Sequence, residues 1–224
     1  MKLFLRKNIF FIFWGIVLLD LVSVVLNTPQ PVFILKPLLM PSLIVAVLAF
    51  SPGSTGRIKV LVALFFSFLG DTFLLFQDKN PLFFILGLCC FLTTHIFYIA
   101  YFIQLSKNGA SVAKKYPYLV VAIAAYSGAL LYLLMPGLAD LKIPVIIYAC
   151  IISIMLYFSL NIPFRISQKI RRFFFIGAAC FVISDSLLAI NKFYHTFPAA
   201  DFLIMLTYCV AQYFIVKGFI RNRY

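Results

Sequence analysis

Apolar runs of about 20 residues recur from one end of this chain to the other, and they are its most constraining feature. A run of that length crosses the hydrocarbon core of a bilayer as one α-helix. Of the 224 residues, 64% are hydrophobic and 11% are charged, and the mean hydropathy is +1.08. So few polar residues could not cover a soluble globule. We therefore predict an all-α, polytopic membrane protein in which residues 1–224 form a single transmembrane domain.

The breaks between the apolar runs carry Pro, Gly, Asn or charged residues, as turns do. They divide the chain into eight predicted transmembrane helices, with ends accurate to about 2–4 residues. The predicted helices cover residues 8–26, 31–50, 58–76, 81–105, 117–135, 142–160, 172–190 and 198–220. The first run is too long for a signal-peptide core and lacks a small-x-small cleavage site, so we expect it to be retained.

The basic residues are distributed unevenly about these helices. Fifteen of the 19 Lys and Arg residues fall on the side that holds both termini. They are Lys2, Arg6, Lys7, Arg57, Lys59, Lys107, Lys114, Lys115, Arg165, Lys169, Arg171, Arg172, Lys217, Arg221 and Arg223. Only Lys79, Lys142 and Lys192 fall on the other side, and Lys36 lies inside a helix. The positive-inside rule then predicts cytoplasmic termini, in a bacterial cytoplasmic membrane, and explains the net charge of +13 without a nucleic-acid partner.

Two Asp residues lie inside apolar runs in similar settings. Asp71 occurs in the run Ser67–Leu75, and Asp185 occurs in Ile183–Leu188. In each, a small residue precedes the Asp and a hydroxyl residue follows it. A carboxylate near the centre of a spanning helix costs about 2.5–3.5 kcal/mol on insertion scales, so such residues indicate function by default.

Two further ionisable residues lie at a similar predicted depth. With both termini cytoplasmic, Asp20, Lys36, Asp71 and Asp185 all fall roughly 7–9 Å below the outer edge of the apolar layer, at 1.5 Å per residue. We expect one polar pocket in the outer half of the bundle. Lys36 would be a counter-ion to an Asp or a phosphate contact, unless its side chain extends outward to the interface.

A weak internal repeat accompanies the two Asp residues. Aligning them aligns the third and fourth predicted helices with the seventh and eighth. In this alignment His95 lies one position away from Tyr208, and Tyr98 is aligned with Gln212. Four helices separate the copies, which suggests a parallel 4+4 repeat about an axis along the membrane normal. These side chains could line a substrate channel, or they could form interhelical hydrogen bonds, which is the better interpretation of Ser67 and Gln212.

A pair of carboxyl groups suggests acid–base chemistry. One Asp could stay protonated as a general acid while the other, ionised, orients or deprotonates water. The structural alternative is that each Asp cross-links helices by hydrogen bonds. A metal site is harder to assemble, because His95 is the only His expected to be buried and no HExxH motif occurs. The five Cys residues include no CxxC, so we predict neither disulfides nor a zinc site.

The ordered motifs resemble those of a known family. Lys-Pro-x-x-Met at Lys36–Met40, Ser-x-x-Gly-Asp at Ser67–Asp71, His-x-x-Tyr at His95–Tyr98 and Ser-Asp-x-x-Leu-Ala at Ser184–Ala189, followed by Asn191, look like the YhhN family. Its characterised members are lysoplasmalogenases. The resemblance covers nearly the whole chain and implies a hydrolase that cleaves the vinyl ether bond of a membrane lipid, lysoplasmalogen.

Vinyl ether hydrolysis fits these residues independently. It needs an acid for the alkene carbon, an anion beside the oxocarbenium ion and a base for water, much as paired carboxylates serve glycosidases. We expect Asp71 and Asp185 to be catalytic, with no metal or cofactor. Substrate-binding or electrostatic roles are predicted for Lys36, Asp20, His95, Tyr98, Asn191, Tyr208 and Gln212.

Two other functions stay open at this point. Intramembrane Asp and Lys residues with a parallel repeat also suit a small-molecule or proton-coupled transporter. A metal-dependent membrane lipid hydrolase is the third class. An assay of activity on a defined lysoplasmalogen, with and without a chelator, separates these three functions. The sequence does not indicate the oligomeric state.

Overall fold

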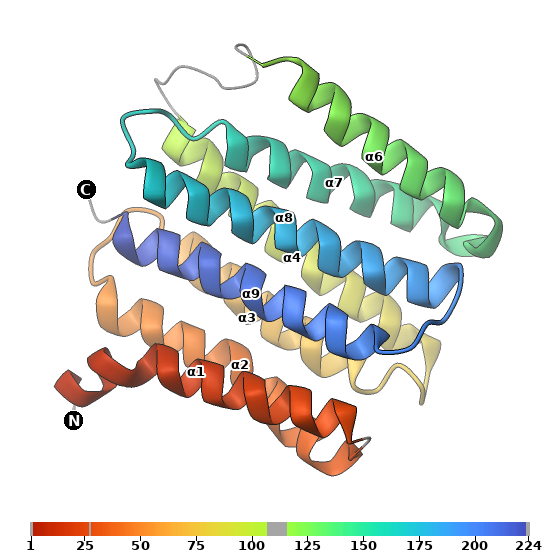
Figure 1. Ribbon diagram of the computed structural model, residues 1–224, viewed down its shortest axis with the longest axis horizontal. Coiled ribbons are helices and arrows are strands. Elements are labelled where there is room, and N and C mark those ends of the chain that lie inside the picture. Colours follow the sequence, from red (N-terminus) through yellow and green to blue (C-terminus); the bar gives the residue numbers. More distant parts are fainter. Residues whose placement is uncertain (1, 27, 107–115, 223–224) are drawn as a thin grey trace. The chain divides into compact units, whose positions relative to one another are not determined.

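The computed structural model describes residues 2–26, 28–106 and 116–222, and the regular structure in these ranges is entirely helical (Figure 1). The α-helices are α1 (Lys2–Val25), α2 (Pro29–Phe50), α3 (Arg57–Leu74), α4 (Pro81–Ser106), α6 (Tyr118–Leu134), α7 (Lys142–Leu160), α8 (Gln168–Phe193) and α9 (Ala200–Arg221). Two 3₁₀ turns, Met135–Gly137 and Ala139–Leu141, join α6 to α7.

Seven helices in the described part of the chain are long and apolar enough to cross a membrane. The prediction of an all-α, multi-pass membrane protein is therefore confirmed. The remaining helix is α3, which has 18 residues and carries Arg57, Lys59 and Asp71 within them. Because α3 has only 18 residues, all three charges fall inside any segment of it long enough to span, and the predicted count of eight spans depends on this helix.

The observed helix bounds follow the predicted ones closely, with two extensions. Helix α1 begins at Lys2, six residues before the predicted start. Helix α8 begins at Gln168, four residues early, and continues to Phe193. Both extensions carry Lys and Arg, which are good helix formers and continue a helix beyond the apolar layer. Hydropathy alone therefore marks the spanning part of a helix and misses its charged end.

The described residues fall into two compact units, and the first comprises Met1–Tyr98 with Phe219–Tyr224. Within it α1 packs along α2, and α2 packs on α3. Stacked rings of Phe10 and Phe50, with centroids 6.2 Å apart, join α1 to the end of α2. Helices α3 and α4 approach closely at Gly70, where a Cβ would come within 2.8 Å of the Phe91 ring.

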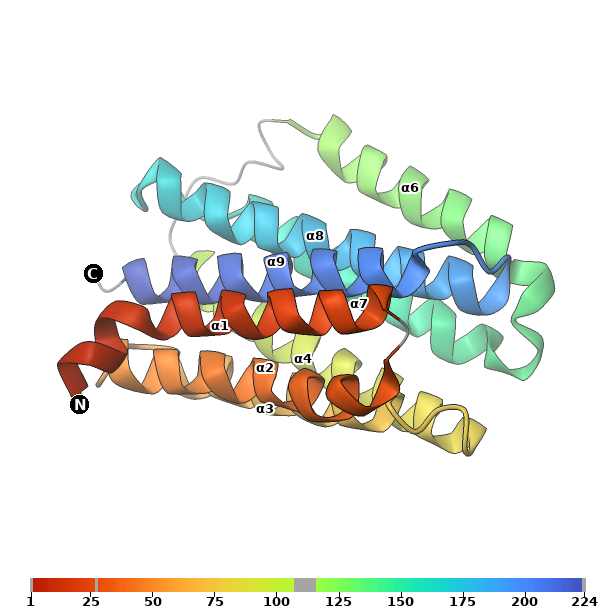
Figure 2. The ribbon, with the colours of Figure 1, turned by 60° about the horizontal axis from the view of Figure 1, so that its bottom comes forward.

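The second unit comprises Ile99–Gly218. Within it α6 packs on α7 and α8, and α7 packs on α8 (Figure 2). Helices α8 and α9 meet at Gly177, where a Cβ would lie 2.9 Å from the carbonyl oxygen of Ala211. Helix α6 buries only Leu134 within the structure, so most of its surface is free to face lipid. The prediction of a single domain over residues 1–224 stays a prediction.

Candidate active site

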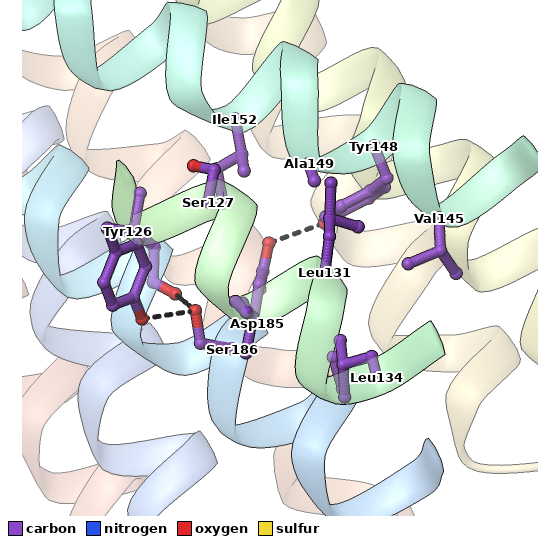
Figure 3. Close-up of a pocket in the computed structure, with 13 residues that line it drawn as sticks. Tyr126, Ser127, Leu131, Leu134, Val145, Tyr148, Ala149, Ile152, Asp185 and Ser186 are labelled. Carbon is purple, nitrogen blue, oxygen red and sulfur yellow. Dashed lines mark hydrogen bonds between the residues drawn. The ribbon is translucent and has the colours of Figure 1, made fainter. Parts of the chain in front are cut away.

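Asp185 has a short hydrogen bond to a neighbouring helix. The hydroxyl of Tyr148 on α7 donates to Oδ2 of Asp185 on α8 over 2.6 Å (Figure 3). A bond of this length between a hydroxyl and a carboxyl is at the strong end of the O–H···O range. It fixes the carboxyl at the contact between the two helices.

The two side chains line a cavity of about 50 Å³ between α6, α7 and α8. Most of its wall is aliphatic, including Leu131, Leu134, Val145 and Ile152, as Figure 3 shows. The polar lining residues are Tyr126, Ser127, Tyr148, Asp185 and Ser186. Since one water needs about 10–15 Å³ of such a cavity, it can hold a few waters or a short apolar segment.

Further hydroxyl bonds tie α6 to its neighbours around this cavity. The hydroxyl of Tyr126 donates to Oγ of Ser186 over 2.8 Å, and Ser186 donates to the carbonyl of Val182. The hydroxyls of Ser127 and Ser153 lie 2.7 Å apart. Interhelical bonds of this kind contribute about 0.6–2 kcal/mol each in membranes. They hold a weakly buried helix over the cavity.

Asp71 lies in the first unit and is 2% exposed. One turn earlier on α3, Oγ of Ser67 lies 3.1 Å from Oγ1 of Thr94 on α4, and Thr94 donates to the carbonyl of Ala63. Asp71 precedes the end of α3 by three residues, whereas Asp185 precedes the end of α8 by eight. The sequence suggests about five for both, because it places the end of α3 two residues late and the end of α8 three residues early.

Asp20 and Lys36 form a second polar feature of the first unit. Asp20 on α1 is 1% exposed, and its Oδ1 is buried without a hydrogen-bond partner. The ammonium group of Lys36, on the adjacent helix α2, lies within electrostatic reach of this carboxyl. Lys36 itself is half-buried. Its position fits the predicted counter-ion role, with Asp20 as the carboxyl it faces.

The other predicted binding residues are distributed over both units. His95 and Tyr98 on α4 belong to the first and are fully buried, as is Gln212 on α9 in the second. The Tyr208 ring packs edge-on against Phe181, one turn before Asp185 on α8. Asn191 has a local structural role, since its Oδ1 accepts from the backbone N–H of Phe197, 3.4 Å away in the connection to α9.

The predicted residues therefore fall into separate sets. Asp20, Lys36 and Asp71 belong to one unit and Asp185 belongs to the other, so their convergence on one pocket stays a prediction. Within the described ranges, no three His, Cys, Asp or Glu side chains gather as a metal site would require. The sequence did not single out Tyr148, because a Tyr in a spanning helix is common and the helical period does not reveal which helix it faces.

Comparison with known proteins decides the family. The model of the YhhN family matches residues 32–219. The chain belongs to the YhhN family. The matched part contains every predicted site residue except Asp20.

Several relatives of this chain carry an activity in their names. Lysoplasmalogenase TMEM86A of Homo sapiens is 30% identical over 180 residues, covering 79% of this chain and 71% of the human protein. Lysoplasmalogenase TMEM86B of Mus musculus is 28% identical over 181 residues, 80% of this chain and 71% of the mouse protein. A lysoplasmalogenase of Mycobacterium tuberculosis is 30% identical over 142 residues, 62% of this chain and 52% of that protein. No solved structure matches the chain significantly.

Proposed function

We propose that this YhhN-family protein is a lysoplasmalogenase. It hydrolyses the vinyl ether bond of a lysoplasmalogen, releasing a fatty aldehyde and glycerophosphoethanolamine or glycerophosphocholine. The observation that carries this conclusion is the 30% identity to a human lysoplasmalogenase across 79% of the chain. A one-chain ether lipid partitions into the bilayer, where the apolar helices of this protein lie.

The chemistry assigns one task to each carboxyl group. A protonated Asp gives its proton to the outer alkene carbon, and the carbon bonded to oxygen becomes an oxocarbenium ion. The ionised Asp stabilises this cation and takes a proton from the water that attacks it. The resulting hemiacetal breaks its carbon–oxygen bond to the glycerol, leaving an aldehyde and a free hydroxyl. Asp71 and Asp185 are the proposed pair, and the overall reaction consumes one water.

The cavity beside Asp185 supports this scheme. Its aliphatic wall suits the alkenyl chain, and its polar side chains include a carboxyl group held by hydrogen bonding. Its lining is mostly apolar, so the cation would form beside few competing nucleophiles. The binding roles proposed for Lys36, His95, Tyr98, Tyr208 and Gln212 follow from their burial or charge and from the motif pattern. Asn191 is proposed to contribute to substrate binding in addition to accepting the hydrogen bond from Phe197.

The proposed membrane arrangement has eight spans, with α3 as one of them and both termini in the cytoplasm of a bacterial cell. The proposed parallel repeat rests on the alignment of Asp71 with Asp185, and the two helix hairpins that it pairs are cross-linked at different positions. In α3–α4, Ser67 bonds Thr94 and Gly70 lies against Phe91. In α8–α9, Ser184 donates to the carbonyl of Ile204 and Gly177 lies against Ala211. These contacts lie at different distances from the two Asp residues, so the repeat is proposed from the sequence alignment alone.

The test is aldehyde release by purified protein in detergent from a synthetic lysoplasmalogen, with the saturated 1-alkyl analogue as the matched control. Protonation of an alkene carbon requires the double bond, so the alkyl analogue should not react. Aldehyde release that persists in a chelator supports the two-carboxyl scheme. Loss of activity with chelator and its return with a metal ion would favour a metal-dependent hydrolase. Inactivity combined with solute flux in vesicles would favour a transporter.

A further inference from the structure

We propose that Tyr148 is the positioning residue of this site, holding the carboxyl group of Asp185 in one orientation at the cavity wall. The expected effect of Tyr148 on turnover rests on the proposed function. The contact between Tyr148 and Asp185 rests on the geometry alone. The Tyr148 hydroxyl donates to Oδ2 of Asp185 over 2.6 Å, and both side chains line the same cavity (Figure 3).

Asp185 needs such a partner because its side chain turns about two bonds. A carboxyl that changes rotamer moves its oxygen atoms by more than the tolerance of a proton transfer, and a misplacement of about 1 Å can cost on the order of 10²-fold in rate. Tyr148 belongs to α7, which packs directly against α8. The hydrogen bond from Tyr148 therefore anchors the carboxyl group to a neighbouring helix and restricts the rotation of the Asp185 side chain.

The same cavity supplies a matched control. Tyr126 on α6 also donates to a side chain of α8, over 2.8 Å, but its acceptor is Ser186. Ser186 follows Asp185 directly in the chain and is not part of the proposed acid–base pair. Tyr126→Phe thus removes a comparable interhelical bond at the same cavity. Tyr148→Phe removes the bond to the carboxyl and keeps the ring.

The experiment compares kcat and KM of Tyr148→Phe and Tyr126→Phe on one lysoplasmalogen, normalised to monodisperse protein. We expect Tyr148→Phe to lower kcat by about 10–100-fold with KM changed less than about 2-fold, because a misoriented carboxyl is felt in the transition state and not in lipid binding. Because Tyr126 lines the same cavity, Tyr126→Phe can change KM, and its fall in kcat should be several-fold smaller than that of Tyr148→Phe. Equal effects of the two variants, or a near-normal kcat for Tyr148→Phe, overturn the proposal.

A spectroscopic measurement makes the contact testable without turnover. The infrared difference between the unmodified protein and Asp185→Asn gives the carboxyl stretching band of Asp185. We expect Tyr148→Phe to shift this band and Tyr126→Phe to leave it unchanged. An unshifted band overturns the proposal. If the band shifts but the unmodified protein releases no aldehyde, the contact holds while the lysoplasmalogenase function fails, so the two failures are distinguishable.

Discussion

Tyr148 and Asp185, on the adjacent helices α7 and α8, are joined by a 2.6 Å hydrogen bond at the wall of an apolar cavity. In hydrocarbon an unsatisfied polar group costs several kcal/mol, so the bond lowers the cost of keeping this carboxyl inside a spanning segment. It also orients Asp185 at the wall of this cavity. In the proposed mechanism the same contact also orients Asp185 for catalysis, and measurements of turnover and of stability separate the two effects.

Lys36→Met is expected to destabilise the protein through Asp20. The variant leaves a carboxyl that is 1% exposed without its nearby cation. Since Lys36 is half-buried and acts on Asp20 through space, the loss should lie below the cost of about 3–5 kcal/mol for a broken buried ion pair. Thermal unfolding in detergent measures it. Adding Asp20→Asn should recover most of the loss, and an additive double variant would show that the two side chains do not interact.

Gly177→Ala is expected to weaken the contact between α8 and α9. The new methyl would lie 2.6 Å from Cγ1 of Ile215 and 2.9 Å from a backbone oxygen, which cannot rotate away. Overpacking of this kind costs about 1–3 kcal/mol. Gly128→Ala on α6 is the control, because no atom lies within 4 Å of its added methyl, and its effect should be neutral or stabilising by up to about 1 kcal/mol. Equal melting temperatures for the two variants would contradict this packing.

The sequence predicts the helices well and their ends less well, for a physical reason. Apolar length specifies the segment that crosses a bilayer, so the start of α7 at Lys142 is obtained directly. The charged extensions of α1 and α8 lie outside that segment and depend on helix propensity, which hydropathy does not measure. The cost of a buried charge likewise singles out Asp71 and Asp185 as candidates.

What the sequence could not supply is the pairing of side chains between helices. Tyr148 lies in an apolar run with no motif around it, and its bond to Asp185 depends on the rotation of α7 against α8. The same holds for Tyr126 and Ser186. Periodicity in the sequence identifies the buried face of a single helix. A contact between two side chains also depends on how two helices are rotated and shifted along their axes relative to each other.

The proposed topology predicts which positions are labelled from outside intact cells. In a variant lacking the native cysteines, a Cys at Asn80, exposed between α3 and α4, should react with an impermeant maleimide. A Cys at Gln168, the exposed first residue of α8, should react only after permeabilisation. Labelling of Gln168→Cys in intact cells without labelling of Asn80→Cys would reverse the orientation. Asn108, the other cytoplasmic position suited to this test, lies outside the described residues.

Filling the cavity should impair turnover. Ala149 on α7 lines it, and Ala149→Leu adds about three methylene-sized groups to a space of about 50 Å³. We expect kcat/KM for a long-chain lysoplasmalogen to fall by about 10-fold or more, since the alkenyl segment can no longer lie beside Asp185. Ala129→Leu, on the exposed surface of α6, adds the same volume and should have little effect. If both variants keep normal kcat/KM, the substrate does not use this cavity.

The two-carboxyl mechanism predicts that only two of the six Asp residues are needed for the chemical step. Asp→Asn preserves size and most hydrogen bonding but removes the ability to give or take a proton, and loss of an acid–base partner costs about 10²–10⁴-fold in rate. Asp71→Asn and Asp185→Asn should each lose that much aldehyde release.

The controls for this prediction are Asp78→Asn, Asp140→Asn and Asp201→Asn, because all three side chains are exposed. The sequence suggests that these residues lie in outer loops, although Asp201 lies in the first turn of α9. None of these three carboxyl groups lines the cavity proposed for the alkenyl chain. Asp20→Asn should affect stability more than kcat. Near-normal turnover by both Asp71→Asn and Asp185→Asn, in monodisperse protein, would assign the two residues a structural role and leave the acid to be found elsewhere.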